Sequence, residues 1–133
     1  MVNCFVNTIV FVKDINRSKQ FYIDVLGLKI VQDLDTIVFF ENHFVIHIAD
    51  SIIKTVFKKN NRFAKMKQGR KNILIYFETN KLTECYKKIE TMKVKFIHGI
   101  EEQAWGQKVF RFFDPDGHIV EIGEPFRVET LSN

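Results

Sequence analysis

A chain of 133 residues, 46% of them hydrophobic and 27% charged, has the size and composition of one compact domain. No apolar run reaches the ~20 residues that span a bilayer, and no charged region precedes an apolar core at the N-terminus. We therefore expect a cytoplasmic protein with no membrane partner. Cys4 and Cys85 are too few for a disulfide framework or a zinc knuckle, so we expect two reduced, buried thiols.

The net charge of +4 originates in one segment. Between Asp50 and Glu78 the chain carries eight lysines and arginines and no acid, so the rest of the chain is mildly acidic. A basic run with interleaved aromatic residues can meet nucleic acid, but a charge run is more often a solvated face. We expect no nucleic-acid partner and interpret Lys54 to Lys71 as a mobile flap over an anionic ligand.

The first half of the chain reads as a strand, a helix and three strands. Residues 4–13 are apolar on both alternations, which predicts a strand covered by a helix on one side. Asp14 is a suitable N-cap for the helix, and Gly27 stands where a left-handed residue ends it. Three short strands are expected over 28–33, 36–41 and 43–49.

The second half repeats this order. Residues 72–78 predict a strand, Asn80 a helix N-cap, and an apolar stripe at helical spacing the helix itself. The segments that follow the two helices match at a separation of 66 residues, which indicates an internal duplication. The last three strands are expected over 94–97, 108–113 and 119–123.

Two such βαβββ repeats predict an α+β domain. The repeats occupy about 3–50 and 72–124 of a single domain over 1–127, are joined by the basic flap 51–71, and are followed by a tail over 128–133. Four strands from each half would form an open eight-stranded barrel-like sheet around one groove, with the helices outside. The fourteen phenylalanines either pack the sheet faces or line that groove.

Two motifs point to a known family. The stretch from Phe112 to Glu121 is a strand, a tight Asp-Pro-Asp-Gly turn and a second strand with one inward carboxylate. With the opening segment from Val10 to Leu28, it resembles the vicinal oxygen chelate superfamily over residues 3–125. That superfamily includes glyoxalase I, extradiol dioxygenases, fosfomycin-resistance enzymes and bleomycin-binding proteins.

The duplication itself locates a candidate site. Asn7 and Asn72 match in the first strands of the two halves, and His47 and Glu121 match in the last strands. Equivalent positions should face each other across the groove, and all four are polar within otherwise apolar strands, which often marks a functional site. For any one of them, an interior polar group that hydrogen-bonds to backbone or water is the favoured explanation, and only the convergence of all four on one groove makes the two explanations even. Both interpretations stay open.

The resemblance implies a specific role for these four positions. In metal-dependent members of the superfamily these four positions supply metal ligands, typically His or Glu. An amide oxygen is a weak ligand for zinc, nickel or ferrous iron, and a catalytic zinc site keeps three protein ligands. Only His47 and Glu121 are strong ligands here. We expect no metal cofactor, with a weak divalent-metal site at His47 and Glu121 as the alternative.

Three further residues are expected to contact the ligand. Trp105 precedes the strand that leads to the turn, where members of the superfamily carry a similar Trp-Gly pair beside the pocket mouth, although simple packing explains it equally well. Arg111 meets an anionic ligand if it points inward, which the sequence leaves open. Phe57 lies in the basic flap and would cover the ligand.

The remaining histidines carry weaker expectations. His118 directly follows the turn and His98 lies near a strand end, so both are expected to face solvent. His43 begins a predicted strand and would share a face with His47.

Three functions remain open. The first is a metal-free small-molecule-binding protein whose ligand is anionic or aromatic, because the basic flap disfavours a cation such as bleomycin. The second is an enzyme, a glyoxalase-like lyase or a dioxygenase, that uses His47 and Glu121 as acid, base or metal ligands. The third is an interaction module whose groove is filled by phenylalanines. Members of the superfamily commonly dimerise, so the resemblance implies a homodimer.

Overall fold

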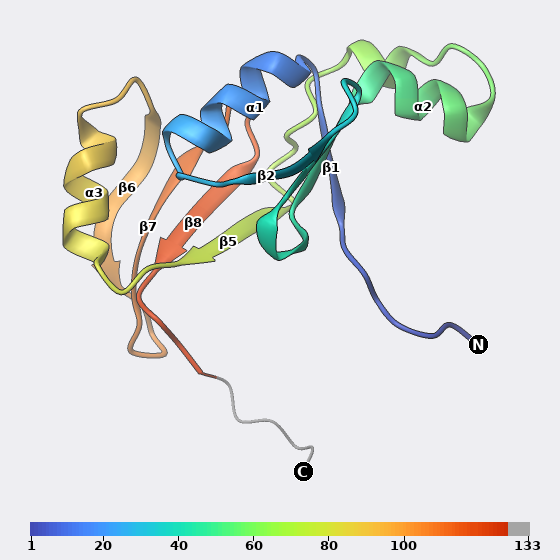
Figure 1. Ribbon diagram of the computed structural model, residues 1–133. Coiled ribbons are helices and arrows are strands. Elements are labelled where there is room, and N and C mark those ends of the chain that lie inside the picture. The colour runs from blue at the N-terminus through green and yellow to red at the C-terminus, as the bar shows by residue number, and fades with distance from the viewer. Residues whose placement is uncertain (128–133) are drawn as a thin grey trace. The chain divides into compact units, whose positions relative to one another are not determined.

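The structure is a computed structural model that describes residues 1–127 and contains two compact units (Figure 1). The first unit comprises Met1–Arg70 and Pro115–Gly117, and the second comprises Lys71–Asp114 with the residues from His118 onward. The tail expected over 128–133 lies outside the described residues. Within them, no helix is long and apolar enough to cross a membrane.

The first unit is built from one repeat. Its elements are β1 (Ile9–Val12), α1 (Ile15–Asp24), β2 (Ile30–Asp33), β3 (Ile37–Phe40), a 3-10 turn (Glu41–His43), β4 (Val45–Ile48), α2 (Ala49–Phe57) and a second 3-10 turn (Arg62–Lys65). The sheet has the order β1-β4-β3-β2, in which β1 and β4 are parallel and the other pairs antiparallel.

The second unit repeats the pattern. Its elements are β5 (Leu74–Glu78), α3 (Leu82–Glu90), β6 (Lys95–Glu102), β7 (Lys108–Phe113) and β8 (Ile119–Gly123), in the sheet order β5-β8-β7-β6. The register also repeats, because Phe11 pairs with His47 in the first parallel pair as Tyr76 pairs with Glu121 in the second. The α+β fold of two βαβββ repeats is confirmed, and the strands of each repeat hydrogen-bond into a sheet of their own.

Several local expectations were wrong. The first strand is shorter than 4–13, and Cys4 is exposed rather than buried. Lys81, not Asn80, occupies the N-cap of α3, and the Thr79 hydroxyl accepts a hydrogen bond from the Lys81 backbone N–H. The segment 51–71 is not a plain loop, because it holds the end of α2 and the second 3-10 turn.

The core of the first unit lies between α1 and the sheet. Asp14 accepts a hydrogen bond from the Arg17 backbone N–H at 3.0 Å, as its predicted N-cap role requires. Tyr22 of α1 is fully buried and its ring lies 4.8 Å from that of Phe44. Gly27 adopts a φ of 67° just after the helix, which confirms the predicted left-handed residue.

The core of the second unit is aromatic. Tyr86 of α3 lies edge-on to Phe96 and Phe110, at ring distances of 5.3 and 5.0 Å, and Phe110 stacks on Phe112. Figure 1 shows α3 beside β6. Phenylalanine therefore supplies much of the packing between sheet and helix in this unit.

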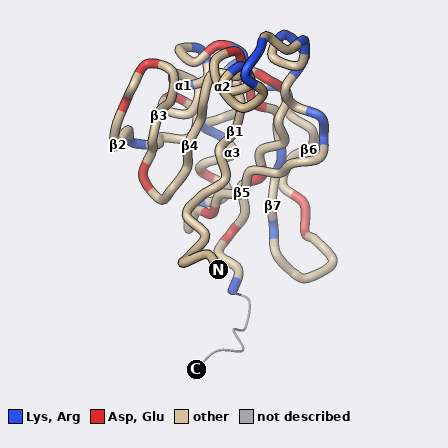
Figure 2. The backbone as a smooth tube through the Cα atoms, turned by 90° about the vertical axis from the view of Figure 1, so that its right-hand side faces the viewer, with Lys and Arg blue, Asp and Glu red and all other residues tan. Residues whose placement is uncertain are grey.

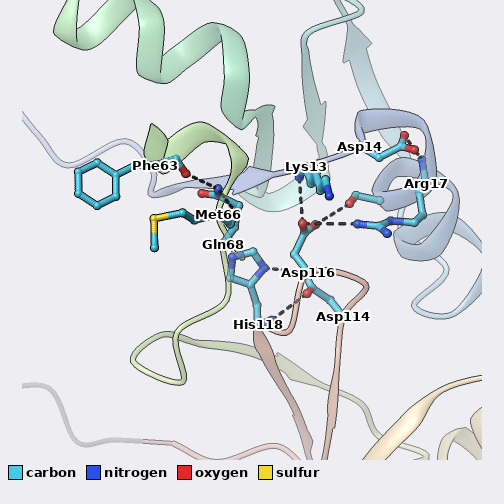
Figure 3. A network of polar contacts seen from close by, with 10 residues as sticks. Lys13, Asp14, Arg17, Phe63, Met66, Gln68, Asp114, Asp116 and His118 are labelled. Atoms are coloured by element: carbon cyan, nitrogen blue, oxygen red, sulfur yellow. Dashed lines mark hydrogen bonds and ion pairs between the residues drawn. The ribbon is translucent and has the colours of Figure 1, made fainter. Parts of the chain in front are cut away.

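The tip of the hairpin between β7 and β8 belongs to the first unit, where Asp116 is fixed by three donors (Figure 3). Its carboxylate accepts hydrogen bonds from the Lys13 backbone N–H at 2.9 Å and from the Ser18 hydroxyl at 3.2 Å, and Arg17 lies 3.5 Å away. Asp116 is 5% exposed and Ser18 is fully buried. The contact holds the turn against the junction of β1 and α1.

The base of the same turn is closed within the second unit. Asp114 accepts hydrogen bonds from the backbone N–H of His118 at 2.9 Å, and its other oxygen lies 2.8 Å from the His118 ring Nδ1. His118 is only 4% exposed, so the expectation that it faces solvent was wrong. Gly117 has the positive φ, 87°, that the sequence predicts for the turn.

Glu78 ties the end of the described chain to β5. Its carboxylate accepts hydrogen bonds from the Tyr76 hydroxyl at 2.6 Å, from the Phe126 backbone N–H and from Arg127. These donors, led by Tyr76, lower the pKa of Glu78 below its ordinary value.

We expect the substitution Asp116→Ala to lower the free energy of unfolding by about 2–4 kcal/mol, because it leaves the buried Ser18 hydroxyl and the Lys13 N–H without an acceptor. Asp116→Asn should cost less, since an amide oxygen still accepts one of these bonds. Urea unfolding measures both. The exposed control Asp24→Ala should stay within about 0.5 kcal/mol of the wild type, and an equally small effect of Asp116→Ala would contradict the role of this contact.

A second prediction concerns acid stability. Because the pKa of Glu78 is lowered in the folded protein, its contribution to stability is present above the ordinary value of about 4.5 and is lost as the pH falls through the folded value. Glu78→Gln should therefore lower the urea midpoint at pH 7 and have less effect at pH 3. The control Glu102→Gln, at an exposed carboxylate of β6, should show no such difference between the two pH values.

Candidate functional site

A row of polar side chains crosses the sheet of the second unit, on the face opposite α3. Tyr76 pairs with Glu121, Glu121 with Arg111, and Arg111 with His98, so the row runs over β5, β8, β7 and β6. Residues that pair directly across strands point to the same side of the sheet, and Phe110 and Phe112 point to the other side, toward α3.

Arg111 is the centre of this row. Its Nε donates to Glu121 Oε1 at 2.6 Å, its Nη2 donates to Gln103 Oε1 at 3.0 Å, and its Nη1 lies 2.9 Å from His98 Nε2. Glu121 is 6% exposed, and its charge is compensated by the ion pair with Arg111, whose side chain is 20% exposed. A guanidinium has five N–H donors, and these contacts leave two without a partner among residues 1–127.

The hydrogen bonds of His98 fix its tautomer. Its Nδ1 lies 2.7 Å from the Gly99 carbonyl oxygen, which can only accept, so Nδ1 carries the proton and Nε2 accepts from Arg111. The neutral ring is therefore the form that orients Arg111. The expectation that His98 faces solvent was wrong, since its side chain is 19% exposed and lies within this network.

Gln107 holds two aromatic residues of the second unit. Its Nε2 donates to the Tyr76 hydroxyl at 2.6 Å and to the Glu124 carbonyl, and its Oε1 accepts from the Trp105 indole at 2.8 Å. Gln107 is 4% exposed while Trp105 is 52% exposed, so a buried amide orients an exposed ring. Burial, followed by the hydrogen bond to Glu78, raises the pKa of Tyr76.

The matching row of the first unit is mostly apolar. Phe11, His47 and Ile37 pair across β1, β4 and β3, on the face opposite α1. His47 is half-buried, and its Nδ1 lies 3.0 Å from the Ile48 carbonyl oxygen. His43 lies in the first 3-10 turn, exposed and at a φ of 65°, so it does not share a strand face with His47 as expected.

The residues predicted to be equivalent occupy matching positions relative to the strands of the two repeats. His47 and Glu121 are each the third residue of the last strand of their repeat. Asn7 and Asn72 each stand two residues before the first strand rather than within it, Asn7 half-buried and Asn72 exposed. The alternation argument that placed both asparagines on an inner strand face therefore does not apply.

The structure brings together only some of the predicted site residues. Arg111 and Glu121 are in direct contact, while Trp105 is held through Gln107. Phe57 ends α2 in the first unit and is 54% exposed. Their partners Tyr76, His98, Gln103 and Gln107 were not predicted from the sequence, where their one signal is placement on or beside neighbouring strands.

Comparison with known proteins places this geometry in a family. Residues 5–127 match the glyoxalase-like domain. A crystal structure of a protein of unknown function from Agrobacterium tumefaciens str. C58 is 46% identical, covers 95% of this chain and 97% of that chain, and has a TM-score of 0.87. No curated protein matches this chain.

More distant structures share the fold alone. A lactoylglutathione lyase from Agrobacterium tumefaciens is 20% identical over 93% of this chain and 95% of its own, with a TM-score of 0.68. A glyoxalase-related enzyme from Fulvimarina pelagi is 17% identical over 93% and 89%, with a TM-score of 0.73. The resemblance read from the two sequence motifs is confirmed: the chain belongs to the glyoxalase-like domain family of the vicinal oxygen chelate superfamily.

Proposed function

We propose that the protein is a cytoplasmic small-molecule-binding member of its family that works without a transition-metal ion and takes an anionic or aromatic ligand. Arg111 is the observation that carries the proposal. Its guanidinium is held by Glu121, Gln103 and His98, keeps two N–H donors and is 20% exposed. A group already fixed by three partners loses little freedom on binding, and a guanidinium can meet a planar carboxylate through two parallel hydrogen bonds.

Aromatic contacts support the same ligand class. Trp105 presents an exposed indole whose orientation is set by Gln107, and an oriented ring is a suitable surface for a planar ligand. Asn72 is a further proposed contact in the second unit, and Phe57, His47 and Asn7 are proposed contacts within the first unit.

The proposal of a metal-free site rests on ligand chemistry. Glu121, the strongest candidate ligand, already compensates the positive charge of Arg111 at 2.6 Å. A metal ion there would have to replace or repel that guanidinium, and the amides of Asn7 and Asn72 offer a transition metal little in exchange. The alternative, a metal-dependent lyase or dioxygenase that uses His47 and Glu121, requires Glu121 to release Arg111.

We also propose a homodimer. β5 is an edge strand of its sheet, and Leu74 and Tyr76 on it are 44% and 42% exposed. An edge strand with exposed apolar side chains is a surface on which a second chain can pair.

We predict that the purified protein holds no stoichiometric zinc, nickel or iron. Elemental analysis after dialysis against metal-free buffer measures this directly. One tightly held transition metal per chain would contradict the proposal and favour the enzyme. In that case Asn7→His together with Asn72→His should strengthen metal binding further, because imidazole is the better donor.

We predict that benzoate stabilises the protein against heat more than benzamide or benzylamine does. Arg111→Met alone would leave Glu121 buried and unpaired, at a cost of about 3–5 kcal/mol, so the test uses Arg111→Met with Glu121→Gln. This double variant should bind benzoate about 10–100-fold more weakly, as expected for the loss of a charge-assisted pair of hydrogen bonds. Lys87→Met, on the exposed side of α3, is the matched control.

The competing outcomes are distinct. An unchanged benzoate response in the double variant, or a preference for benzylamine, would overturn the role of Arg111. Weaker benzoate binding in the control as well would point to general surface charge.

A further inference from the structure

Basic side chains surround two neighbouring hollows of the first unit. The smaller, about 310 Å³, is lined among others by Lys13, Arg17, Lys65 and Lys67, and the larger, about 460 Å³, by Lys54, Arg62, Lys65, Asn60 and Asn61. Lys65 lines both. Figure 2 shows lysines and arginines gathered beside α2 and along the chain that follows it.

We propose that these two hollows form a binding site for a small molecule that carries two phosphate groups, one in each hollow, with Lys65 between them. None of the lining residues belongs to the polar row of the second unit, so the proposal does not depend on ligand binding at Arg111.

The positive charge of the basic residues around the smaller hollow is not compensated by acidic residues that line it. Among the described residues, Asp116 is the one carboxylate that lines it, and that group already accepts from the Lys13 backbone N–H and the Ser18 hydroxyl and pairs with Arg17. Figure 3 shows this carboxylate turned toward Lys13 and Arg17. The ammonium groups of Lys65 and Lys67 have no carboxylate within 4.0 Å among residues 1–127.

The side chain of Lys67 lies close to the turn at Gly117. A Cβ atom added to Gly117 would lie 2.6 Å from Lys67 Cε and 3.1 Å from its Nζ. The glycine therefore allows the lysine to lie across the turn, where its charge joins that of Lys13 and Lys65 around one hollow. Like charges gathered in this way repel each other, and a bound anion relieves the repulsion.

The larger hollow is lined by side-chain amides as well as by basic side chains. Lys54 and Arg62 have no carboxylate within 4.0 Å in the described chain, and Asn60 and Asn61 contribute amides. Asp50 is the one acid among its lining residues. Ammonium, guanidinium and amide N–H groups are the donors that proteins use for phosphate oxygens.

The basic residues stand on an ordered scaffold. Asn61 accepts from the Phe63 backbone N–H at 3.0 Å, and Gln68 donates to the carbonyls of Phe63 and Met66 at 2.9 and 2.8 Å. Ala64 packs with Ile53 of α2 in a small buried cluster. Hollows of a few hundred Å³ on such a scaffold fit a small ligand, whereas a nucleic acid needs a groove that follows its backbone.

Isothermal titration calorimetry at matched ionic strength tests the proposal with inorganic pyrophosphate, orthophosphate and sulfate. Pyrophosphate should bind more tightly than either single anion, because only it carries two phosphate groups, and Lys65 lines both hollows. Lys65→Gln should weaken pyrophosphate binding about tenfold or more, as expected for one charge-assisted contact, and should reduce the advantage of pyrophosphate over orthophosphate. Lys67→Gln is a second variant, and Lys87→Gln on α3 is the control.

Three results would overturn the proposal: equal affinity for all three anions, equal loss in Lys87→Gln, or tighter binding of a single-stranded oligonucleotide that Lys65→Gln abolishes. The last would assign the surface to nucleic acid. The Arg111→Met, Glu121→Gln double variant should keep its pyrophosphate affinity, so failure of the ligand site at Arg111 and failure of the phosphate site are distinguishable.

Discussion

A carboxylate that is only 6% exposed needs a positive partner, and the pairing of Glu121 with Arg111 at 2.6 Å meets this need in the second unit. The pair determines what else this face of the sheet can do. It neutralises the residue that would otherwise be the best metal ligand, and it places a guanidinium with spare donors in the middle of four strands. The chemistry of the face is therefore that of an oriented arginine.

The two repeats have kept one backbone and diverged in the chemistry of the sheet faces opposite α1 and α3. At matching register, Phe11 and His47 of the first unit stand where Tyr76 and Glu121 stand in the second. The first unit instead carries its polar character outside the sheet, in the basic residues that follow α2. Duplication thus supplied two copies of a scaffold, and the side chains that make specific contacts differ between them.

The sequence predicted the elements whose signals are local. The strands over 108–113 and 119–123 have the expected bounds, because a Pro-Asp-Gly turn separates two strongly apolar runs. Helix α2 was missed because its residues were assigned to the basic flap over 51–71, on the evidence of the run of lysines and arginines that begins at Lys54. Its formation depends on packing of Ala49 and Ile53 with Phe11 and Ala64, and such tertiary contacts override local preference.

The contacts around Arg111 could not be predicted from the alternation of side chains along the strands. The pairing of β6 with β7 shifts register on both sides of His98, so a strict period of two does not predict which side chains of β6 reach Arg111. The inward carboxylate at Glu121, by contrast, lies on a regular strand, and its direction was predictable.

Buried carboxylates lie in the turn before β8 and in the middle of β8, and the two have different partners. Asp116 is held by a backbone N–H and a buried hydroxyl, together with an exposed arginine. Glu121 is held by a guanidinium that keeps two N–H donors and is itself oriented by His98 and Gln103. Burial of an acid is thus a poor guide to a site in this fold. The donors left over on its partner are a second criterion, and Arg111 keeps two of them among residues 1–127.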